Sequence, residues 1–191
     1  MLAHRLFGCV SMEKTYGEFL AKDGRRIVLR APRIGDLDDF LELINSLVDE
    51  GAEIPVESRK TREAEADWLG RLLADIEKGF AICVVGEADG KLIANSEVRK
   101  GTGRKQHIGG LAIALKDGYR DVGIGTEMMR LLVEESRRGG LRLLCLSVYE
   151  SNLRARHVYE KVGFREVGRI PKAICKGDQY LDEVVMALEL Q

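Results

Sequence analysis

The feature that most constrains the fold is a loop with two glycines, Gly123 and Gly125, placed between an apolar run and an amphipathic run. The apolar run, 108–115, is typical of a buried strand, and the run 127–138 has helical periodicity. A strand, a short glycine loop and a helix start together expose unpaired backbone N–H groups and a partial positive charge. Glycine also lets an anion approach the backbone closely. The sequence therefore predicts a phosphate-binding site within an α/β domain.

Two familiar phosphate-binding motifs do not match this loop. A P-loop needs a lysine before the hydroxyl residue that follows its second glycine, but Thr126 follows Gly125 directly. A dinucleotide-binding motif needs a third small residue at the position of Met128, because that residue allows close packing of helix on strand. The pattern that remains is Arg120-x-x-Gly123-x-Gly125.

The composition indicates one globular domain. The chain has 191 residues, of which 45% are hydrophobic and 32% charged. Its net charge of −1 offers no electrostatic case for binding nucleic acid or an anionic membrane. No apolar run is long enough to span a membrane, and the first ten residues make a poor signal peptide. Both Met1 and Met12 remain open as the translation start.

Cysteine and histidine usage gives no sign of disulfides or a metal site. The four cysteines are isolated, and the three histidines lack metal-ligand spacing. We therefore expect no metal and, by default, a cytoplasmic location.

The rest of the chain alternates between strand-like and helix-like segments. Strands are expected over 15–21, 26–30, 80–86, 91–99, 108–115, 141–148, 164–170 and 180–189. Helices are expected over 36–50, 61–78, 127–138 and 152–161. Asp36 is the expected cap of the first helix.

A second cluster of polar residues follows the expected strand 141–148. Asn152, Ala155 and Tyr159 are spaced so that they share one face of a helix. A small residue between two polar ones suits a surface that lies against a ligand chain. Taken alone, the same residues also fit an ordinary helix cap and a half-buried packing tyrosine.

Taken together, the two clusters resemble the GCN5-related N-acetyltransferase (GNAT) superfamily. The matching residues are Arg120-x-x-Gly123-x-Gly125 and Asn152…Ala155…Tyr159-x-Lys161-x-Gly163-Phe164. The resemblance implies a single α/β domain over 26–191, preceded by an extension, 1–25, that holds a short strand. It implies a mixed, mostly antiparallel sheet of six to seven strands, splayed at the acetyl-CoA site, with about four helices. It also allows a homodimer.

The resemblance implies how acetyl-CoA, the expected co-substrate, is bound. Backbone amides of the loop and helix start hold its pyrophosphate in this family. Here these amides belong to Arg120, Asp121, Val122, Gly123, Ile124, Gly125 and Thr126. The pantetheine arm pairs with the end of the preceding strand, here Ile113, Ala114 and Leu115. On the second cluster's helix, Asn152 bonds the arm from the other side, and Ala155 and Lys161 complete the binding motif.

The resemblance also implies direct attack of an amine on the thioester in a ternary complex. Tyr159 would protonate the leaving thiolate, and a backbone N–H near Ile113 or Leu115 would stabilise the oxyanion. Many relatives carry a carboxylate on the strand before the glycine loop, but 108–115 contains none. The general base is therefore open between a water chain and three side chains, namely Glu97, His107 and Glu150.

The acceptor pocket of such folds lies between the loop that joins the first two helices and the connection of the last two strands, here 49–60 and 171–182. Acidic residues in the first segment would attract a cationic amine, and basic residues in the second suit a carboxylate. The tail 177–186 also resembles branches that acetylate small amines or amino acids, such as polyamine acetyltransferases. We therefore expect a small amine or amino acid as acceptor. The alternatives are a protein N-terminus or lysine, or a non-catalytic acyl-CoA sensor.

Overall fold

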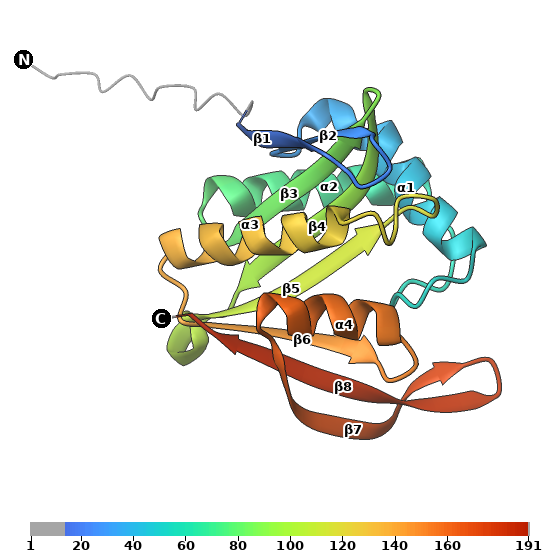
Figure 1. Cartoon of the computed structure of the whole chain (residues 1–191), viewed down its shortest axis with the longest axis vertical. Helices are drawn as coiled ribbons and strands as arrows, with labels where there is room; N and C mark the ends of the chain where they lie inside the picture. Colours follow the sequence, from blue (N-terminus) through green and yellow to red (C-terminus); the bar gives the residue numbers. More distant parts are fainter. Residues whose placement is uncertain (1–13, 191) are drawn as a thin grey trace, which may run out of the picture.

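The computed structural model describes residues 14–190, which form one sheet with helices on both faces (Figure 1). The strands are β1 (Thr15–Leu20), β2 (Arg26–Arg30), β3 (Ala81–Ala88), β4 (Lys91–Lys100), β5 (Ile108–Leu115), β6 (Leu143–Tyr149), β7 (Arg165–Lys176) and β8 (Gln179–Glu189). The helices are η1 (Ile34–Asp36), α1 (Leu37–Asp49), α2 (Arg62–Glu77), η2 (Gly103–Lys105), α3 (Ile124–Arg138) and α4 (Leu153–Val162). The predicted positions of strands and α helices agree with these bounds to within a few residues, except at β7.

The eight strands of the described chain follow the order β1-β2-β3-β4-β5-β6-β8-β7. All neighbours are antiparallel except β5 and β6, which are parallel. The sheet is therefore mixed and mostly antiparallel, as predicted, but it has eight strands rather than six or seven. The difference arises because β1 pairs with β2 and extends the edge of the sheet. The two candidate translation starts, Met1 and Met12, lie outside the described residues.

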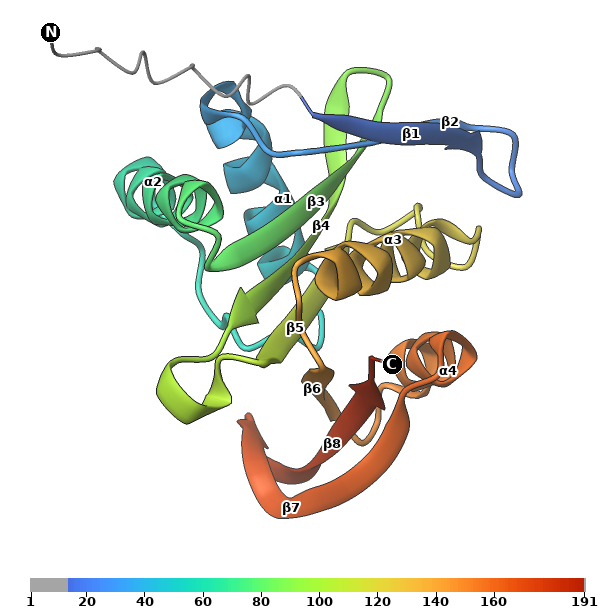
Figure 2. The same ribbon diagram turned by 90° about the vertical axis from the view of Figure 1, so that its left-hand side faces the viewer.

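The two faces of the sheet carry separate cores, and Figure 2 shows α1 and α2 on one side and α3 and α4 on the other. Alternation along the strands divides the side chains between these faces. Cys83 and Val85 of β3 pack with the apolar residues of α1 and α2. Val84, between them, packs with Met128 and Met129 of α3. Each face of the central strands is thus buried under a different pair of helices.

Asp36 precedes α1, as predicted, but its side chain does not cap this helix. Its carboxylate instead accepts hydrogen bonds from the Arg30 guanidinium at 2.8 and 2.9 Å and from the Arg33 N–H at 2.7 Å. Arg30 is only 5% exposed and also donates to Glu87 at 2.7 Å. A buried guanidinium needs charged partners, and the Asp36 carboxylate pairs with Arg30 for this reason. It is therefore not available for the cap of α1 that the sequence predicts.

The C-terminal strands form a longer hairpin than the sequence suggests. Strand β7 continues through Pro171 to Lys176, so most of the expected connection 171–182 is strand. The pairing of β7 with β8 is interrupted between Ile170 and Ile174, where Lys172 has a φ of +54°. Because β7 is an edge strand, a proline at such a bulge costs no ladder hydrogen bond.

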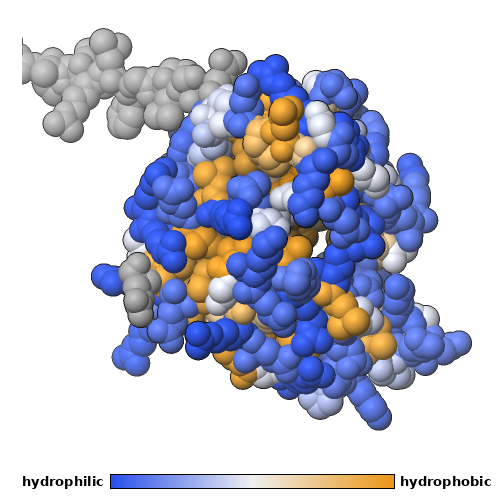
Figure 3. All heavy atoms as spheres, viewed as in Figure 1, coloured by the Kyte–Doolittle hydropathy of each residue, from blue (hydrophilic) through white to orange (hydrophobic). Residues whose placement is uncertain are grey.

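The centre of the sheet is split, as predicted. Strand β5 pairs with β6 only over Ile108–Gly110, opposite Leu143–Cys145, and the two strands then separate. Figure 1 shows them diverging from a common start toward the glycine loop and the start of α4. In Figure 3, the surface is hollowed in this part of the same view. The gap leaves one edge of β5 and one edge of β6 unpaired.

Candidate active site

The glycine loop leads from β5 into α3 through three residues with left-handed backbone conformation. These are Gly118 (φ +77°), Asp121 (φ +64°) and Gly123 (φ +95°). Gly123 is the N-cap of α3, and the helix begins at Ile124, three residues earlier than the periodicity predicts. A side chain at Gly123 would be strained by the backbone angle. The backbone conformation at this position therefore favours glycine.

The backbone N–H groups of this loop are available to a ligand. From Arg120 to Thr126, none of them donates to an acceptor within residues 14–190. The last of them are the orphan donors of the first turn of α3, where the helix dipole is positive. Seven free donors around a positive helix end fit a pyrophosphate.

The β1–β2 hairpin holds the loop from one side. The Lys22 N–H donates to the carbonyl of Val122 at 3.0 Å. Arg25 donates to the carbonyl of Gly118, and its guanidinium lies 4.0 Å from the centre of the Tyr119 ring. These contacts use carbonyl groups of the loop and leave its N–H groups free.

The side chain of Arg120 is engaged within the protein. Its Nε and Nη2 donate to the carbonyl of Leu115 at 3.0 and 2.7 Å, and it forms an ion pair with Glu50 next to α1. On the other side of the loop, Asp121 lies 3.4 Å from Arg154 of α4. The predicted contribution of Arg120 to ligand binding therefore depends on its backbone, while its side chain fixes the loop against the end of β5.

The free edge of β5 presents alternate backbone groups to the gap. The Lys116 N–H donates to Ile93 of β4 at 2.9 Å. By strand alternation, Ala114 also turns its backbone groups to β4, while Ile113 and Leu115 turn theirs to the gap. Since Arg120 occupies the Leu115 carbonyl, the gap offers two N–H groups and the Ile113 carbonyl. The side chain of Ala114 is only a methyl group, and it lies on the face of β5 opposite to the side chains of Ile113 and Leu115.

Helix α4 faces the gap from the other side. The Asn152 Oδ1 accepts the Ala155 N–H at 3.0 Å, so Asn152 is the helix cap, and its Nδ2 has no acceptor among the described residues. Ala155 is half-buried against the core beneath α3 and α4. Lys161 is exposed in the last turn, about 13 Å along the axis from Asn152. There it lines a shallow groove of about 430 Å³ together with Arg130 and Arg137 of α3.

Tyr159 is suited to donate a proton. Its side chain is 7% exposed and its ring lies 6.2 Å from the ring of Phe164. The hydroxyl makes no hydrogen bond with residues 14–190. Burial raises the pKa of Tyr159 to about 12. The hydroxyl is therefore protonated at neutral pH and cannot serve as a base there.

The three side chains considered as general bases occupy very different places. His107 precedes β5 at the end where β5 and β6 pair, about 26 Å along the strand from Leu115. The structure does not bring His107 to the gap. Glu150 follows β6 at the open end, but its carboxylate accepts the Asp182 N–H at 3.1 Å and lies 3.9 Å from Arg169. Glu97 lies in the middle of β4, opposite Ala112.

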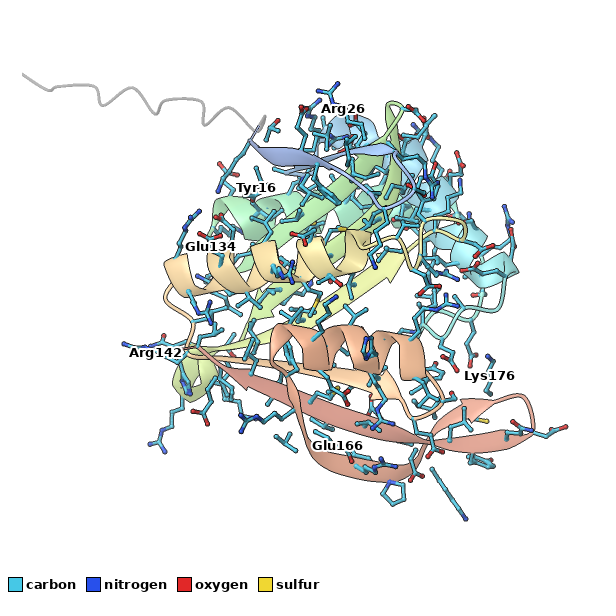
Figure 4. The ribbon with its side chains drawn as sticks, viewed as in Figure 1. Tyr16, Arg26, Glu134, Arg142, Glu166 and Lys176 are labelled. Carbon is cyan, nitrogen blue, oxygen red and sulfur yellow. The ribbon has the colours of Figure 1, made fainter. Side chains whose placement is uncertain are left out.

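The loop between α1 and α2 contacts the end of β6 and the β7–β8 hairpin. The Tyr149 hydroxyl, at the end of β6, donates to the carbonyl of Ile54 at 3.1 Å. Ser151 donates to Glu53, and Lys176 of β7 donates to the carbonyl of Gly51 at 3.4 Å. Figure 4 shows Lys176 on the side of the hairpin that faces this loop. The two segments predicted to form the acceptor pocket are therefore in contact.

Tyr149 lies among acidic side chains, and sequence reasoning missed it. Burial raises the pKa of its hydroxyl, and neighbouring carboxylates raise it further. These carboxylates belong to Glu53, Glu57 and Glu183. The only signal in the sequence was the place of Tyr149 at the end of an apolar strand, which does not reveal its partner 95 positions earlier.

No helix among residues 14–190 is long and apolar enough to span a membrane. Nor do these residues bring together three or more His, Cys, Asp or Glu side chains able to hold a metal ion.

Comparison with known proteins connects this geometry to an enzyme family. Residues 42–164 match the acetyltransferase (GNAT) family model. The L-methionine sulfoximine/L-methionine sulfone acetyltransferase of Pseudomonas paraeruginosa is 23% identical over 170 residues, which cover 85% of this chain and 94% of that protein.

Solved structures share the fold at similarly low identity. The ribosomal-protein-alanine N-acetyltransferase of Brucella melitensis has a TM-score of 0.77 and 22% identity, covering 85% of this chain and 99% of that one. The phosphinothricin acetyltransferase of Sinorhizobium meliloti, solved with acetyl-CoA, has a TM-score of 0.76 and 21% identity, covering 86% of this chain and 88% of that one.

The family match spans most of the chain and includes the split strands, the glycine loop and the start and end of α4. The free N–H groups of the loop and the open edge of β5 fit the pyrophosphate and the amide-bearing arm of acetyl-CoA. The chain belongs to the acetyltransferase (GNAT) family and is an acetyl-CoA-dependent N-acetyltransferase.

Proposed function

We propose that this enzyme acetylates the amino group of a small, amino-acid-like molecule. The observation that carries the proposal is the closure of the acceptor side. The α1–α2 loop is bonded to the end of β6 through Tyr149 and to the β7–β8 hairpin through Lys176. These bonds narrow the approach that an extended peptide or a folded protein would need. The proposal therefore places a small acceptor between the loop and the hairpin.

The charged side chains on the acceptor side also support a small, amino-acid-like acceptor. Carboxylates near Tyr149 suit an ammonium group, and the hairpin contributes the cations of Lys172 and Lys176, which suit a carboxylate. An amino acid carries both groups. The relative from Pseudomonas paraeruginosa is named for two such molecules, methionine sulfoximine and methionine sulfone, and another neighbour for phosphinothricin.

The donor side supports the following division of roles. The N–H groups from Arg120 to Thr126 bind the pyrophosphate, and the free edge at Ile113 and Leu115 holds the pantetheine arm together with the Asn152 Nδ2. A gap-facing N–H of β5 stabilises the oxyanion that forms when the amine attacks. Tyr159, protonated at neutral pH, donates its proton to the leaving thiolate.

The test is a free-thiol release assay with acetyl-CoA across acceptors, with mass spectrometry of the products. The panel contains methionine sulfoximine, methionine sulfone, phosphinothricin, spermidine and a peptide with a free N-terminal alanine. We expect the highest kcat/KM with an amino-acid-like acceptor and a mass gain at its amine. A kcat/KM at least ten times higher for the peptide or the polyamine would contradict the proposed acceptor class. Tight CoA binding without turnover on any acceptor would contradict the proposed function altogether.

A further inference from the structure

The acceptor face of β5 provides no proton acceptor. On this strand Leu111, Ile113 and Leu115 pack toward α3. By alternation, the opposite face, which the acceptor approaches, carries Gly110, Ala112 and Ala114. An acceptor amine arrives largely as ammonium and must lose a proton before it attacks. The proton must therefore go to a group on another element or to a chain of water molecules.

Strand β4 places a carboxylate directly beside this face. Glu97 pairs with Ala112, and Asn95 pairs with Ala114. Residues directly opposite in antiparallel strands share a face, with Cβ atoms about 5 Å apart. Because Ala112 is exposed and carries only a methyl group, there is space above it for a water molecule next to Glu97.

Glu97 is enclosed but loosely held. Its side chain is 17% exposed, and its two contacts with Arg99 are 3.3 and 3.4 Å long. Arg99 makes its shorter contact, 2.8 Å, with Asp75 of α2. Strong carboxylate–guanidinium bonds are about 2.8 Å long, so Glu97 retains bonding capacity for another donor.

The neighbours of Glu97 on adjoining elements are few. On β3 the opposite residue is Cys83, whose thiol donates to Asn95 Oδ1 at 3.2 Å. Among residues 14–190, the Asn95 Nδ2 has no hydrogen-bond acceptor. Across β5, the facing residues carry no charge. Within the described part of the chain, the charged or titratable groups around Glu97 are Arg99, Asp75 and Cys83.

We propose that Glu97 is the proton acceptor of the reaction and acts through one water molecule over Ala112. The inference rests on the proposed acetyl transfer to a small amine. Many relatives carry this carboxylate on the strand before the glycine loop. Here the proposed base lies on β4, the strand beside it. The two other candidate side chains are placed less well, because His107 lies at the closed end of the strands and Glu150 is bonded to Asp182 and Arg169.

The protons of the reaction balance as follows. The ammonium gives one proton through the water to the Glu97 carboxylate, and the free amine forms a C–N bond with the thioester carbonyl. The C–S bond then breaks, and the sulfur takes the proton of the Tyr159 hydroxyl. The tyrosinate recovers a proton from the nitrogen of the new amide through solvent, and Glu97 releases its proton. The net result is N-acetylated product, free thiol and one proton.

The variant Glu97→Gln tests this role. At pH 7 we expect kcat to fall about 100-fold, with an unchanged KM for acetyl-CoA. The loss should shrink as pH rises toward the pKa of the acceptor amine, because a free amine needs no base. Glu18→Gln is the control, since Glu18 is also a strand carboxylate paired with an arginine, Arg26 of β2, but lies on β1. It should retain wild-type kcat.

A second variant tests position rather than folding. Ala112→Glu in the Glu97→Gln background returns a carboxylate to the same face one strand away, and we expect recovery of at least ten-fold in kcat at pH 7. Wild-type activity of Glu97→Gln at pH 7, or an equal loss at every pH with no recovery in the double variant, would overturn the inference. Either result is distinct from failure of the proposed function, in which the wild-type enzyme itself would acetylate no amine.

Discussion

The donor side and the acceptor side of this enzyme are built in different ways. In the proposed assignment, the donor side consists of the free edge of β5 at Ile113 and Leu115 and of two continuous segments, Arg120–Thr126 and Asn152–Tyr159. It binds acetyl-CoA through backbone amides and the Asn152 side chain. The acceptor side combines β4, the end of β6, the α1–α2 loop and the β7–β8 hairpin. A local motif is therefore sufficient to specify the donor. The acceptor depends on contacts between residues about 100 positions apart.

This contrast predicts that variants on the two sides separate into two kinetic classes. Donor-side variants should change acetyl-CoA binding or the departure of the thiolate. Acceptor-side variants should change the KM of the acceptor and leave acetyl-CoA binding intact. The following changes test this separation, beginning with the largest expected effect.

Tyr159→Phe should lower kcat by about 10²–10⁴-fold with little change in the Kd of CoA. The ring and its packing against Phe164 are retained, so only the proton donor is lost. Thiol release measures kcat, and titration calorimetry measures CoA binding. A fully active Tyr159→Phe enzyme would remove this tyrosine from the reaction.

The same substitution has a consequence for stability at high pH. Burial raises the pKa of Tyr159 to about 12, above the ordinary tyrosine value of about 10. The unfolded chain ionises first, so the wild-type protein loses stability as pH rises from about 10 to about 12, while stability below pH 10 is unaffected. Over that range, urea titrations should show a fall in unfolding free energy about 2 kcal/mol larger for wild type than for Tyr159→Phe. Equal losses in both proteins would show that the hydroxyl is not buried as described.

Gly123→Ala should destabilise the protein by about 1–2 kcal/mol, because alanine is strained at a φ of +95°. Distortion of the loop should also weaken CoA binding by about ten-fold. For stability alone, Gly125→Ala is a matched control, since its φ is not positive and the added Cβ meets Leu115 at an ordinary 3.7 Å. Thermal unfolding and CoA titration distinguish the two variants. Equal effects of both would contradict the special role of Gly123.

Tyr149→Phe should raise the KM of the acceptor about five-fold and leave the KM of acetyl-CoA unchanged. The variant removes one hydrogen bond to Ile54, worth about 1 kcal/mol, and so loosens the α1–α2 loop. Initial rates with each substrate varied in turn measure both constants. A change only in the KM of acetyl-CoA would place Tyr149 on the donor side and contradict the proposed division between the two sides.

Local sequence was sufficient to predict most elements of the fold, whereas the roles of the donor-side residues stay predictions. The glycine loop, the Asn152 cap and the split between β5 and β6 lie where the motifs and the family resemblance indicate. What the sequence could not predict depends on long-range partners. The Asp36 carboxylate accepts hydrogen bonds from buried Arg30 instead of capping α1. The Arg120 side chain donates to the carbonyl of Leu115.

The choice among candidate bases illustrates the same limit. Sequence placed Glu97, His107 and Glu150 on or near strands, but strand register decides which of them faces the gap. Only the pairing of β4 with β5 sets Glu97 beside Ala112, and only the β5–β6 pairing shows that His107 lies at the closed end. Register depends on contacts across the sheet, which a local pattern does not contain.

Hydrogen exchange with and without CoA tests the division between the two sides most directly. CoA should slow exchange of the amides from Arg120 to Thr126 and of those of Ile113 and Leu115, which have no protein acceptor. It should leave the amides of 49–60 and of the β7–β8 hairpin unchanged. Protection confined to 49–60 and the hairpin, with none in the glycine loop, would contradict the account.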